Sequence, residues 1–266
     1  LDPNGPFQTG SARLRVDIAW NTENFGNIDP NDDLARAPDS GAPFQPLAID
    51  LKANGVNVGN NIFEATSASA IPTGVSGSGV AIVEGRPQVD LGNGPESLAV
   101  VGRGLTFAID DPAPVDRRQV VDIDKCNDCH KTLSLHGDNR VGNTELCATC
   151  HNPNATDINR RADQCATDLG TDDETIDLKV MVHRIHAGNI GLCGYGNSTH
   201  DYTHVVYPGK LNNCEGCHLE DTYFPVDPAS VPPLEMLVIP DTPVSVVSTT
   251  PTPVTSSGPA FDTVIE

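Results

Sequence analysis

Three copies of Cys-x-x-Cys-His are the residues of this chain whose types and spacing point most clearly to chemistry. They are Cys126-Asn-Asp-Cys129-His130, Cys147-Ala-Thr-Cys150-His151 and Cys214-Glu-Gly-Cys217-His218. This spacing is the attachment signature of c-type haem, in which two thiols bond to one porphyrin and the histidine binds its iron as the proximal ligand. We therefore expect three haems c on the six motif cysteines, with His130, His151 and His218 as proximal ligands.

The main alternatives to haem are zinc and redox-active dithiols, because Cys-x-x-Cys occurs in both kinds of site. Neither alternative requires a histidine directly after the second cysteine. The chain has only eight histidines, and three of them occupy this position. The pattern therefore favours haem.

Five histidines lie outside the motifs and are candidates for the second, distal ligand of each iron: His136, His183, His186, His200 and His204. The chain has only two methionines, so bis-histidine ligation is the economical solution for three six-coordinate haems. His183 and His186 are spaced i, i+3 on a helix expected over residues 173–187, and they can reach two adjacent irons. We expect distal roles for both, and for His136 on a haem other than that of nearby His130.

The three irons have three distal positions, so two of the five candidate histidines are left over. His200 and His204 are either ordinary polar residues or ligands of a haem in another segment or another chain, which would build an assembly. Four arginines lie close in sequence to the expected ligands and could pair with haem propionates, with solvated surface arginine as the alternative. They are Arg140, Arg160, Arg161 and Arg184.

Cys165 and Cys193 are the two cysteines left outside the motifs. A structural disulfide between them is the simplest interpretation, and two free thiols are the alternative. Covalent haem attachment takes place outside the cytoplasm, and disulfides persist there as well. Both inferences therefore indicate a compartment outside the cytoplasm.

The formal net charge of −20 argues against nucleic acid or an anionic membrane surface as a partner. No apolar run approaches the 18 or so residues of a membrane span, so we expect no transmembrane segment. The chain begins at Leu1 without a basic segment or an initiating methionine. We expect a processed or truncated soluble chain.

The composition divides the chain into three regions. Residues 1–118 lack Cys and His and show alternating apolar residues, at Leu14, Val16, Ile18 and Trp20 and again at Leu105, Phe107 and Ile109. This pattern predicts an all-β scaffold or docking domain, sandwich-like or barrel-like. Residues 119–226 hold every Cys and His, and we expect a mostly irregular, partly α-helical trihaem cytochrome domain there. Residues 227–266 are rich in Pro, Ser and Thr, which is typical of an extended linker or arm.

Two acidic stretches, residues 29–33 and 172–177, could in principle bind Ca²⁺ through carboxylate oxygens. Neither has the pattern of an EF-hand. A solvated acidic loop is the simpler interpretation of both.

Five segments in order resemble the OmcA/MtrC family of outer-membrane decahaem cytochromes. They are residues 124–130, 135–137, 147–153, 181–188 and 207–218, which include all three haem motifs and the sequence Met-Val-His-Arg-Ile-His-Ala-Gly. The resemblance implies that a split β-barrel domain precedes the haem domain, and that His136, His183 and His186 are distal ligands. It also implies extracellular electron transfer at the outer membrane to metal oxides, flavins or partner cytochromes through closely stacked bis-histidine haems.

The chain also departs from that family. A family pentahaem domain would have two further motifs after the third, whereas no cysteine follows Cys217. We therefore expect either a trihaem relative or a fragment of a longer multihaem protein.

The main hypothesis is an electron conduit that needs no substrate and so need not be an enzyme. Its expected partners are other multihaem cytochromes or copies of itself, and mineral or soluble electron acceptors. Its expected location is extracellular or on the cell surface, with the periplasm as the alternative. A rival hypothesis is a multihaem reductase with one open-coordination haem for a small-molecule substrate. A third is a subunit of a polymeric cytochrome wire, in which His200 or His204 and the Pro-rich arm reach a neighbour.

Overall fold

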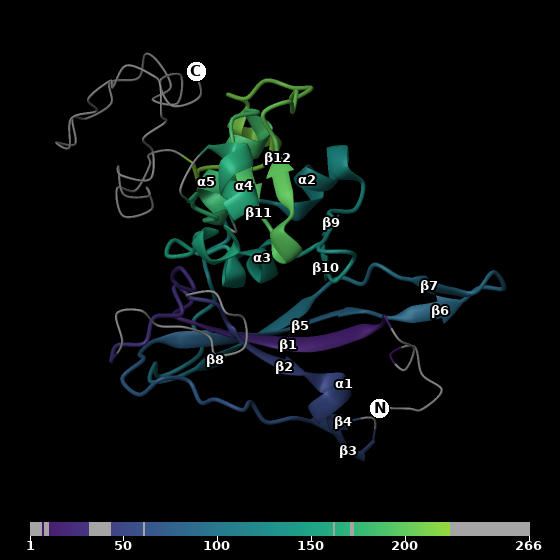
Figure 1. The fold of residues 1–266 in the computed structure, drawn as a ribbon. Coiled ribbons are helices and arrows are strands. Elements are labelled where there is room, and N and C mark those ends of the chain that lie inside the picture. Colours follow the sequence, from purple (N-terminus) through teal and green to yellow (C-terminus); the bar gives the residue numbers. More distant parts are fainter. Residues whose placement is uncertain are drawn as a thin grey trace.

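The structure is a computed structural model that describes residues 7, 11–31, 44–60, 62–161, 163–170 and 173–223. Figure 1 shows two layers, with an antiparallel sheet from the first half of the chain below and the helices of the second half stacked on one side of it. The expected arm, residues 227–266, lies outside the described residues. None of the helices that the structure describes is long and apolar enough to cross a membrane.

The lower layer is a four-stranded antiparallel sheet with the strand order β2-β1-β5-β8. Its strands are β1 (Arg13–Trp20), β2 (Leu47–Asp50), β5 (Ser78–Arg86) and β8 (Arg103–Ala108). The first apolar alternation falls on β1 and the second on β8, except for Ile109, which follows the end of β8 at Ala108. The prediction of an antiparallel β-rich region in the first half is therefore confirmed.

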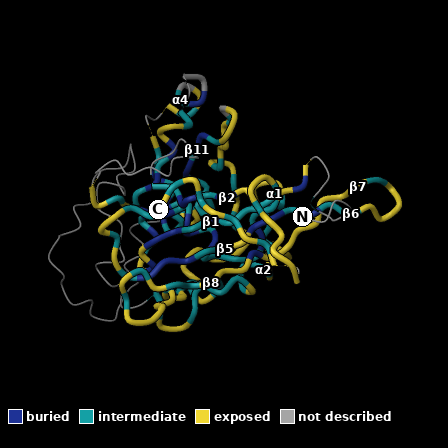
Figure 2. Tube along the Cα trace, turned by 90° about the horizontal axis from the view of Figure 1, so that it is seen from below, coloured by how far each residue is buried: buried dark blue, intermediate teal, exposed yellow. Residues whose placement is uncertain are grey.

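The alternation in β1 suggests that the face with its apolar side chains is the buried one, but in the structure the opposite face is buried more deeply. Leu14, Val16 and Ile18 of β1 are only half-buried, whereas Asp17 and Ala19 on the opposite face are fully buried. Figure 2 shows buried segments along β1 and β5 in the middle of the sheet. The face that carries Asp17 is the more deeply buried one because the second half of the chain packs against it.

Shorter elements surround this sheet. They are the helix α1 (Leu51–Asn54) and two hairpins, β3 (Val56–Gly59) with β4 (Ile62–Glu64) and β6 (Gln88–Asp90) with β7 (Pro95–Ser97). In Figure 1 the β6–β7 hairpin projects sideways from the end of the sheet, at the right of the view. These hairpins are largely exposed.

The upper layer consists of short helices and hairpins joined by irregular segments, as expected for the second half of the chain. In chain order they are α2 (Ile123–His130), β9 (Ser134–Leu135), β10 (Arg140–Val141), α3 (Thr144–Cys150), η1 (Ile158–Arg160), α4 (Asp163–Leu169), α5 (Leu178–His186), β11 (Gly191–Cys193), η2 (Tyr195–Asn197), β12 (Thr199–Asp201) and η3 (Cys214–Gly216). An Asp or Asn side chain caps the N-terminus of three helices of this layer by accepting a backbone N–H. The capping residues are Asp122 for α2, Asn143 for α3 and Asp177 for α5.

Helix α5 is shorter than the predicted helix over residues 173–187. It begins at Leu178 because Asp177 adopts a non-helical conformation and caps it, and Thr175 forms a β-bridge to Thr156 instead of helix. Its end agrees with the prediction. Gly188 has φ +67°, and a Cβ at this position would lie 2.6 Å from the carbonyl oxygen of Val205, so glycine is required there.

One apolar core joins the two layers. Its buried residues come from the sheet region (Ala19, Phe25, Val80, Ile82) and from α3 (Leu146, Ala148). Gly102, just before β8, allows this approach, because a Cβ there would lie 2.9 Å from Leu146 Cδ2. The segment with the second motif is therefore part of the core of the first half, and many contacts cross the predicted boundary at residue 118.

Candidate functional site

The second Cys-x-x-Cys-His motif is anchored on the sheet. Cys147 and Cys150 lie on α3, and Leu146 and Ala148 of the same helix are in the apolar core. Two amide side chains from the sheet region fix the end of the helix, because Asn27 Nδ2 donates to Thr149 O at 2.9 Å and Gln45 Nε2 donates to Cys150 O at 2.9 Å. The motif is therefore positioned by the folded β-rich region.

The first and third motifs are joined to each other instead. Val121, beside α2, forms a β-bridge with His218 of the third motif. The N–H of Asp122 donates to Cys217 O at 2.9 Å, and the Lys125 ammonium donates to the carbonyl oxygens of Glu215 and His218 at 2.9 and 2.6 Å. Neither α2 nor η3 contains a buried residue, so these motifs are held by polar contacts near the surface.

The structure brings each motif histidine next to one histidine from outside the motifs. The ring centroids of His130 and His186 are 6.1 Å apart, with an angle of 83° between the ring planes. The rings of His151 and His136 are 6.1 Å apart at 29°, and those of His218 and His183 are 6.0 Å apart at 27°. His136 thus lies opposite His151 and not opposite its neighbour in sequence, His130.

These separations fit two imidazoles that bind one iron from opposite sides. An imidazole nitrogen lies about 2 Å from a bound transition metal and the ring centre about 1 Å further, so the two ring centres would be about 6 Å apart. Three of the six rings also use Nδ1 to bond a backbone carbonyl. These bonds join His151 to Ile176, His183 to Lys179 and His186 to Val182. Such bonds orient the ring and leave Nε2 for the metal.

The six motif cysteines are not paired with one another in disulfides. Burial, followed by the negative charge of Asp17, raises the pKa of Cys150 to about 12, and burial raises that of Cys147 to about 11. A redox-active dithiol works through a thiolate with a lowered pKa. The second motif therefore lacks the electrostatic setting of a redox dithiol, while its thiols remain available for attachment of a porphyrin.

A site for an isolated metal ion is a different arrangement from these histidine pairs. Within the described part of the chain, no group of three or more His, Cys, Asp and Glu side chains could hold a metal ion. Structural zinc needs four ligands and calcium six or more. Part of each acidic stretch that was considered for Ca²⁺, including Asp32 and Asp172, lies outside the described residues.

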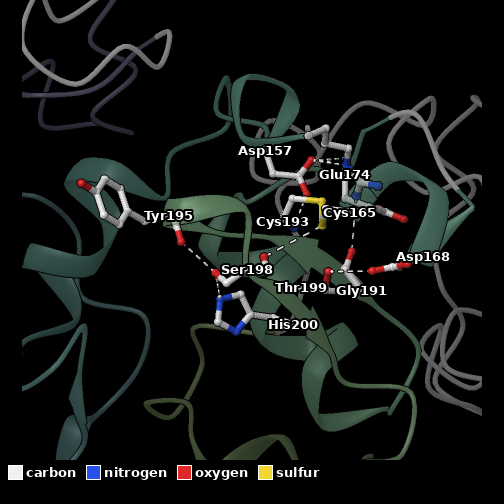
Figure 3. Close-up of a disulfide and its surroundings, with 11 residues drawn as sticks. Asp157, Cys165, Asp168, Glu174, Gly191, Cys193, Tyr195, Ser198, Thr199 and His200 are labelled. Atoms are coloured by element: carbon white, nitrogen blue, oxygen red, sulfur yellow. Dashed lines mark hydrogen bonds and ion pairs between the residues drawn. A yellow bond between two sulfur atoms is a disulfide. The ribbon is translucent and has the colours of Figure 1, made fainter. Parts of the chain in front are cut away.

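His200 and His204 are both exposed. Among the ring contacts of the described residues neither is paired with a motif histidine, although the charge of His200 acts on His136. His200 lies on β12, where its Nε2 is 3.0 Å from Ser198 Oγ and its ring stacks on that of Tyr202 at 6.4 Å. Figure 3 shows His200 beside Ser198 near the disulfide. Their predicted role as distal or intersubunit ligands stays a prediction.

The disulfide between Cys165 and Cys193 is present, as predicted, and links α4 to β11. Asp157 supports the same region: its carboxylate accepts the N–H of Cys193 at 2.8 Å and that of Glu174 at 2.8 Å. It also pairs with Arg161 at 2.9 Å, with both side chains almost completely buried. Figure 3 shows Asp157 over the disulfide. This cluster fixes the chain between the second and third motifs.

The four arginines interpreted as candidate propionate partners all have contacts within the protein. Arg140 pairs with Glu84 at 2.7 Å, Arg161 pairs with Asp157, and the guanidinium of Arg184 pairs with Glu174. Arg160 lies over the ring of Tyr195, 5.6 Å from its centroid. These contacts position the loops around the histidine pairs.

Sequence reasoning missed a group of buried charges on the sheet below the second motif. Glu84 of β5 pairs with Arg15 of β1 at 2.9 Å and with Arg140 of β10 at 2.7 Å. Arg15 also pairs with Asp17 at 2.9 Å. The signal in the sequence was the set of charged residues between the apolar positions of β1, which the alternation rule assigns to solvent. They are buried because α3 and the β9–β10 hairpin cover that face.

Two tyrosines near the histidine pairs were also missed. The ring of Tyr207 meets that of His186 edge-on at 5.5 Å, and the ring of Tyr223 lies 5.8 Å from that of His218. Tyr207 begins the segment that leads into the third motif, so its position in the sequence could have indicated it. Both tyrosines pack against histidines of the first and third motif region.

Comparison with known proteins gives one family. The family model described as "Outer membrane cytochrome MtrC/MtrF-like, domains II/IV" matches residues 118–250. This range contains all three motifs and all eight histidines. A search of curated proteins found no match.

Proposed function

The chain belongs to the MtrC/MtrF-like outer membrane cytochrome family, and we propose from this premise that its three motifs hold three haems c that carry electrons through the protein. Membership implies c-type haem and a role in electron transfer. When bound, each haem supplies an iron that accepts and releases one electron, while the protein sets its ligands and surroundings. The number of haems and the ligand assignment are part of the proposal.

The observation that carries this proposal is the set of three histidine pairs. Each pair joins one motif histidine to one outside histidine at 6.0–6.1 Å. We assign His186 as the distal ligand opposite His130, His136 as that opposite His151, and His183 as that opposite His218. Two strong axial ligands per iron favour fast, reversible electron transfer over binding of a substrate.

The positions of the distal histidines support close contact between two of the haems. His183 and His186 lie on the same helix, α5, one turn apart, and their partners His218 and His130 belong to the two motifs that the Val121–His218 bridge joins. Helix α5 therefore orients ligands for two sites at once. The segment 131–141, with the β9–β10 hairpin, connects the first of these sites to the second-motif site.

The reductase hypothesis requires an iron without a distal ligand. All three motif histidines already have an outside histidine at the spacing of a trans ligand. This geometry favours an electron carrier, and an open iron would contradict the assignment.

The proposal also covers three further points: the role of the β-rich first half, the cellular location of the protein and the partners that accept its electrons. We propose that the sheet region is the scaffold of a split β-barrel domain that docks the haem domain, since its core includes α3. Family membership supports a location at the outer membrane, facing the outside of the cell. We propose that electrons pass to metal oxides, soluble shuttles or partner cytochromes. The net charge of −20 favours neutral or basic docking surfaces on those partners.

The experiment that tests the proposal combines a haem count with substitution of the distal histidines. We expect three haems per chain by the pyridine haemochrome assay and no CO binding to the reduced, folded protein. His136→Ala, His183→Ala and His186→Ala should each open one iron and allow one CO to bind. His204→Ala, an exposed histidine outside the pairs, is the control and should not. CO binding by the unsubstituted protein would support the reductase instead.

His200 and His204 suggest a second, assembly-related role that the same proteins can test. Both are exposed and neither belongs to a histidine pair, so either could contact a neighbouring copy, whose three irons the assigned pairs already supply with two histidines each. If so, the protein should associate as its concentration rises in sedimentation experiments, and His200→Ala or His204→Ala should abolish association. A monomer at high concentration, with unchanged haem spectra in both variants, would exclude the wire hypothesis.

A further inference from the structure

The buried charges below the second motif form a compact cluster with a defined composition. We use the name charge cluster for Arg15, Asp17, Glu84 and Arg140. Asp17 is 0% exposed and Glu84 5% exposed, while the side chains of Arg15 and Arg140 are 31% and 21% exposed. The two arginines and two carboxylates balance in charge when all four are ionised. The two arginines reach the surface, so the charge cluster extends from the buried carboxylates to solvent.

The charge cluster lies next to the second-motif site. Arg140 is on β10, paired in register with Leu135 of β9, and the turn between these strands carries His136. A second arginine fixes the same turn, because Arg86 Nη1 donates to Gly137 O at 2.7 Å. Burial, followed by the positive charge of Arg140, lowers the pKa of His136 to about 4. The charges of the cluster therefore act on the side chains that would hold this haem.

We propose that Glu84 takes up one proton from solvent when the haem of the second motif receives one electron, so that reduction of this haem depends on pH. This inference rests on the proposed function, because it requires a haem between His151 and His136. The electron comes from a one-electron donor, which is an electrode in the test below. The product is the reduced haem beside a neutral Glu84 carboxyl, and no other bond forms or breaks.

The physical reason is charge balance in a buried site. The oxidised iron centre carries one more positive charge than the reduced one, and a nearby positive charge stabilises a carboxylate. When that charge is removed, the ionised form of a buried carboxylate becomes less favourable and a proton restores the balance. A buried, low-dielectric position strengthens this coupling, whereas an exposed carboxylate would be screened by water.

Glu84 is the member of the charge cluster that is poised to exchange a proton near neutral pH. Burial and the negative charge of Asp17 raise its pKa to about 7, and the positive charges of Arg140, Arg15 and Arg13 oppose this rise. These four residues are the charged groups that act on Glu84 from β1 and β10. The neighbouring α3 contributes the thiols of the second motif, which are converted to uncharged thioethers when a haem is attached.

The test is a spectroelectrochemical titration of the haem-loaded protein at several pH values, with the haem count measured on the same sample. In the unsubstituted protein we expect the reduction equilibrium constant of one haem to fall about tenfold from pH 5 to pH 9, which is about 59 mV for one electron. Glu84→Gln should hold this haem at its low-pH potential throughout. Glu96→Gln, at an exposed carboxylate on β7, is the matched control and should keep the pH dependence.

A second variant keeps the inference falsifiable if Glu84→Gln does not fold. Since Asp17 raises the pKa of Glu84, Asp17→Asn should move the pH-dependent transition to lower pH without removing it. Potentials that do not change with pH in the unsubstituted protein would overturn the inference, and so would an unchanged pH dependence in Glu84→Gln. A sample with fewer than three haems would instead contradict the proposed function.

Discussion

Two regions of the molecule hold the same motif in opposite ways. The second-motif site is built into the polypeptide core: α3 contributes Leu146 and Ala148 to the sheet, and buried charges lie beside it. We use the name α5 pair for the first and third motifs together with α5. The first motif lies on α2 and the third begins on η3, and neither of these elements has a buried residue. The two motifs are held by a β-bridge and by Lys125, and α5 places His183 and His186 beside them.

The difference indicates where the chain relies on its own side chains and where it relies on the cofactor. A porphyrin is a large apolar group, and burying apolar surface is the main favourable term in folding. At the α5 pair the haems would supply this apolar surface, whereas at the second-motif site the protein already has it. We therefore expect the second-motif site to depend on core packing and the α5 pair to depend on backbone contacts.

The largest expected effect is on the second-motif site. Leu146→Ala removes a buried side chain from the core that joins α3 to the sheet, and it should lower the free energy of unfolding by about 2–5 kcal/mol. The control is Leu105→Ala on β8, where the side chain is 75% exposed and the expected change is below about 0.5 kcal/mol. Guanidinium unfolding measures both. Equal decreases in the free energy of unfolding of the two variants would show that the second-motif site does not depend on core packing.

A backbone substitution should affect the α5 pair and leave the second-motif site unchanged. Gly188 and Gly196 have nearly equal positive φ, but a Cβ on Gly188 would lie 2.6 Å from Val205 O and one on Gly196 would meet nothing within 4 Å. Gly188→Ala should cost about 1–3 kcal/mol and Gly196→Ala about 1 kcal/mol. Only Gly188→Ala should alter the spectra of two haems together. A change at one haem, or at all three, would contradict the shared role of α5.

The contacts of Lys125 offer a smaller perturbation of the α5 pair. Lys125→Met keeps the length of the side chain but removes its bonds to the carbonyl oxygens of Glu215 and His218, which should cost about 1–2 kcal/mol. Lys210→Met, in an exposed loop, is the control with an expected change near zero. Thermal unfolding followed in the Soret band measures both. An effect confined to the second-motif haem would show that the two regions are not separate.

The smallest expected effect is a pH dependence of stability at the charge cluster. The pKa of Glu84 is raised from 4.5 to about 7 in the folded chain, so its contribution to stability is present below about pH 4.5 and is lost as the pH rises through about 7. In guanidinium unfolding, Glu84→Gln should therefore lose less stability between pH 5 and pH 8 than the unsubstituted protein. Identical losses would show that Glu84 is already ionised at pH 5.

Much of this molecule could be predicted from the sequence because its signals are local. The haem motifs are short and fixed in spacing, the strand alternation of β1 and β8 is regular, and Cys165 and Cys193 were the only cysteines left to pair. The end of α5 at Gly188 was also predictable, since a glycine after the last periodic residue is a common helix stop. These features depend on residues that are close together in the chain.

Long-range packing accounts for what could not be predicted. The pairing of His136 with His151 depends on how the β9–β10 hairpin folds back over α3, and spacing along the chain does not encode that. The burial of Asp17 and Glu84 also depends on α3, because the alternation of β1 alone assigns its charged residues to solvent. Helix α5 starts later than predicted because Asp177, which lies inside the predicted range of 173–187, caps the helix instead of belonging to it.

The most direct test of the central claim is low-temperature EPR of the fully oxidised protein. The account predicts three low-spin signals and no high-spin component. Two signals should be those of irons with nearly parallel histidine planes, from the pairs at 29° and 27°, and one that of nearly perpendicular planes, from the pair at 83°. The perpendicular-type signal should disappear in His186→Ala. A high-spin signal in the unsubstituted protein would contradict the account, because it would mean that one motif histidine has no partner on its iron.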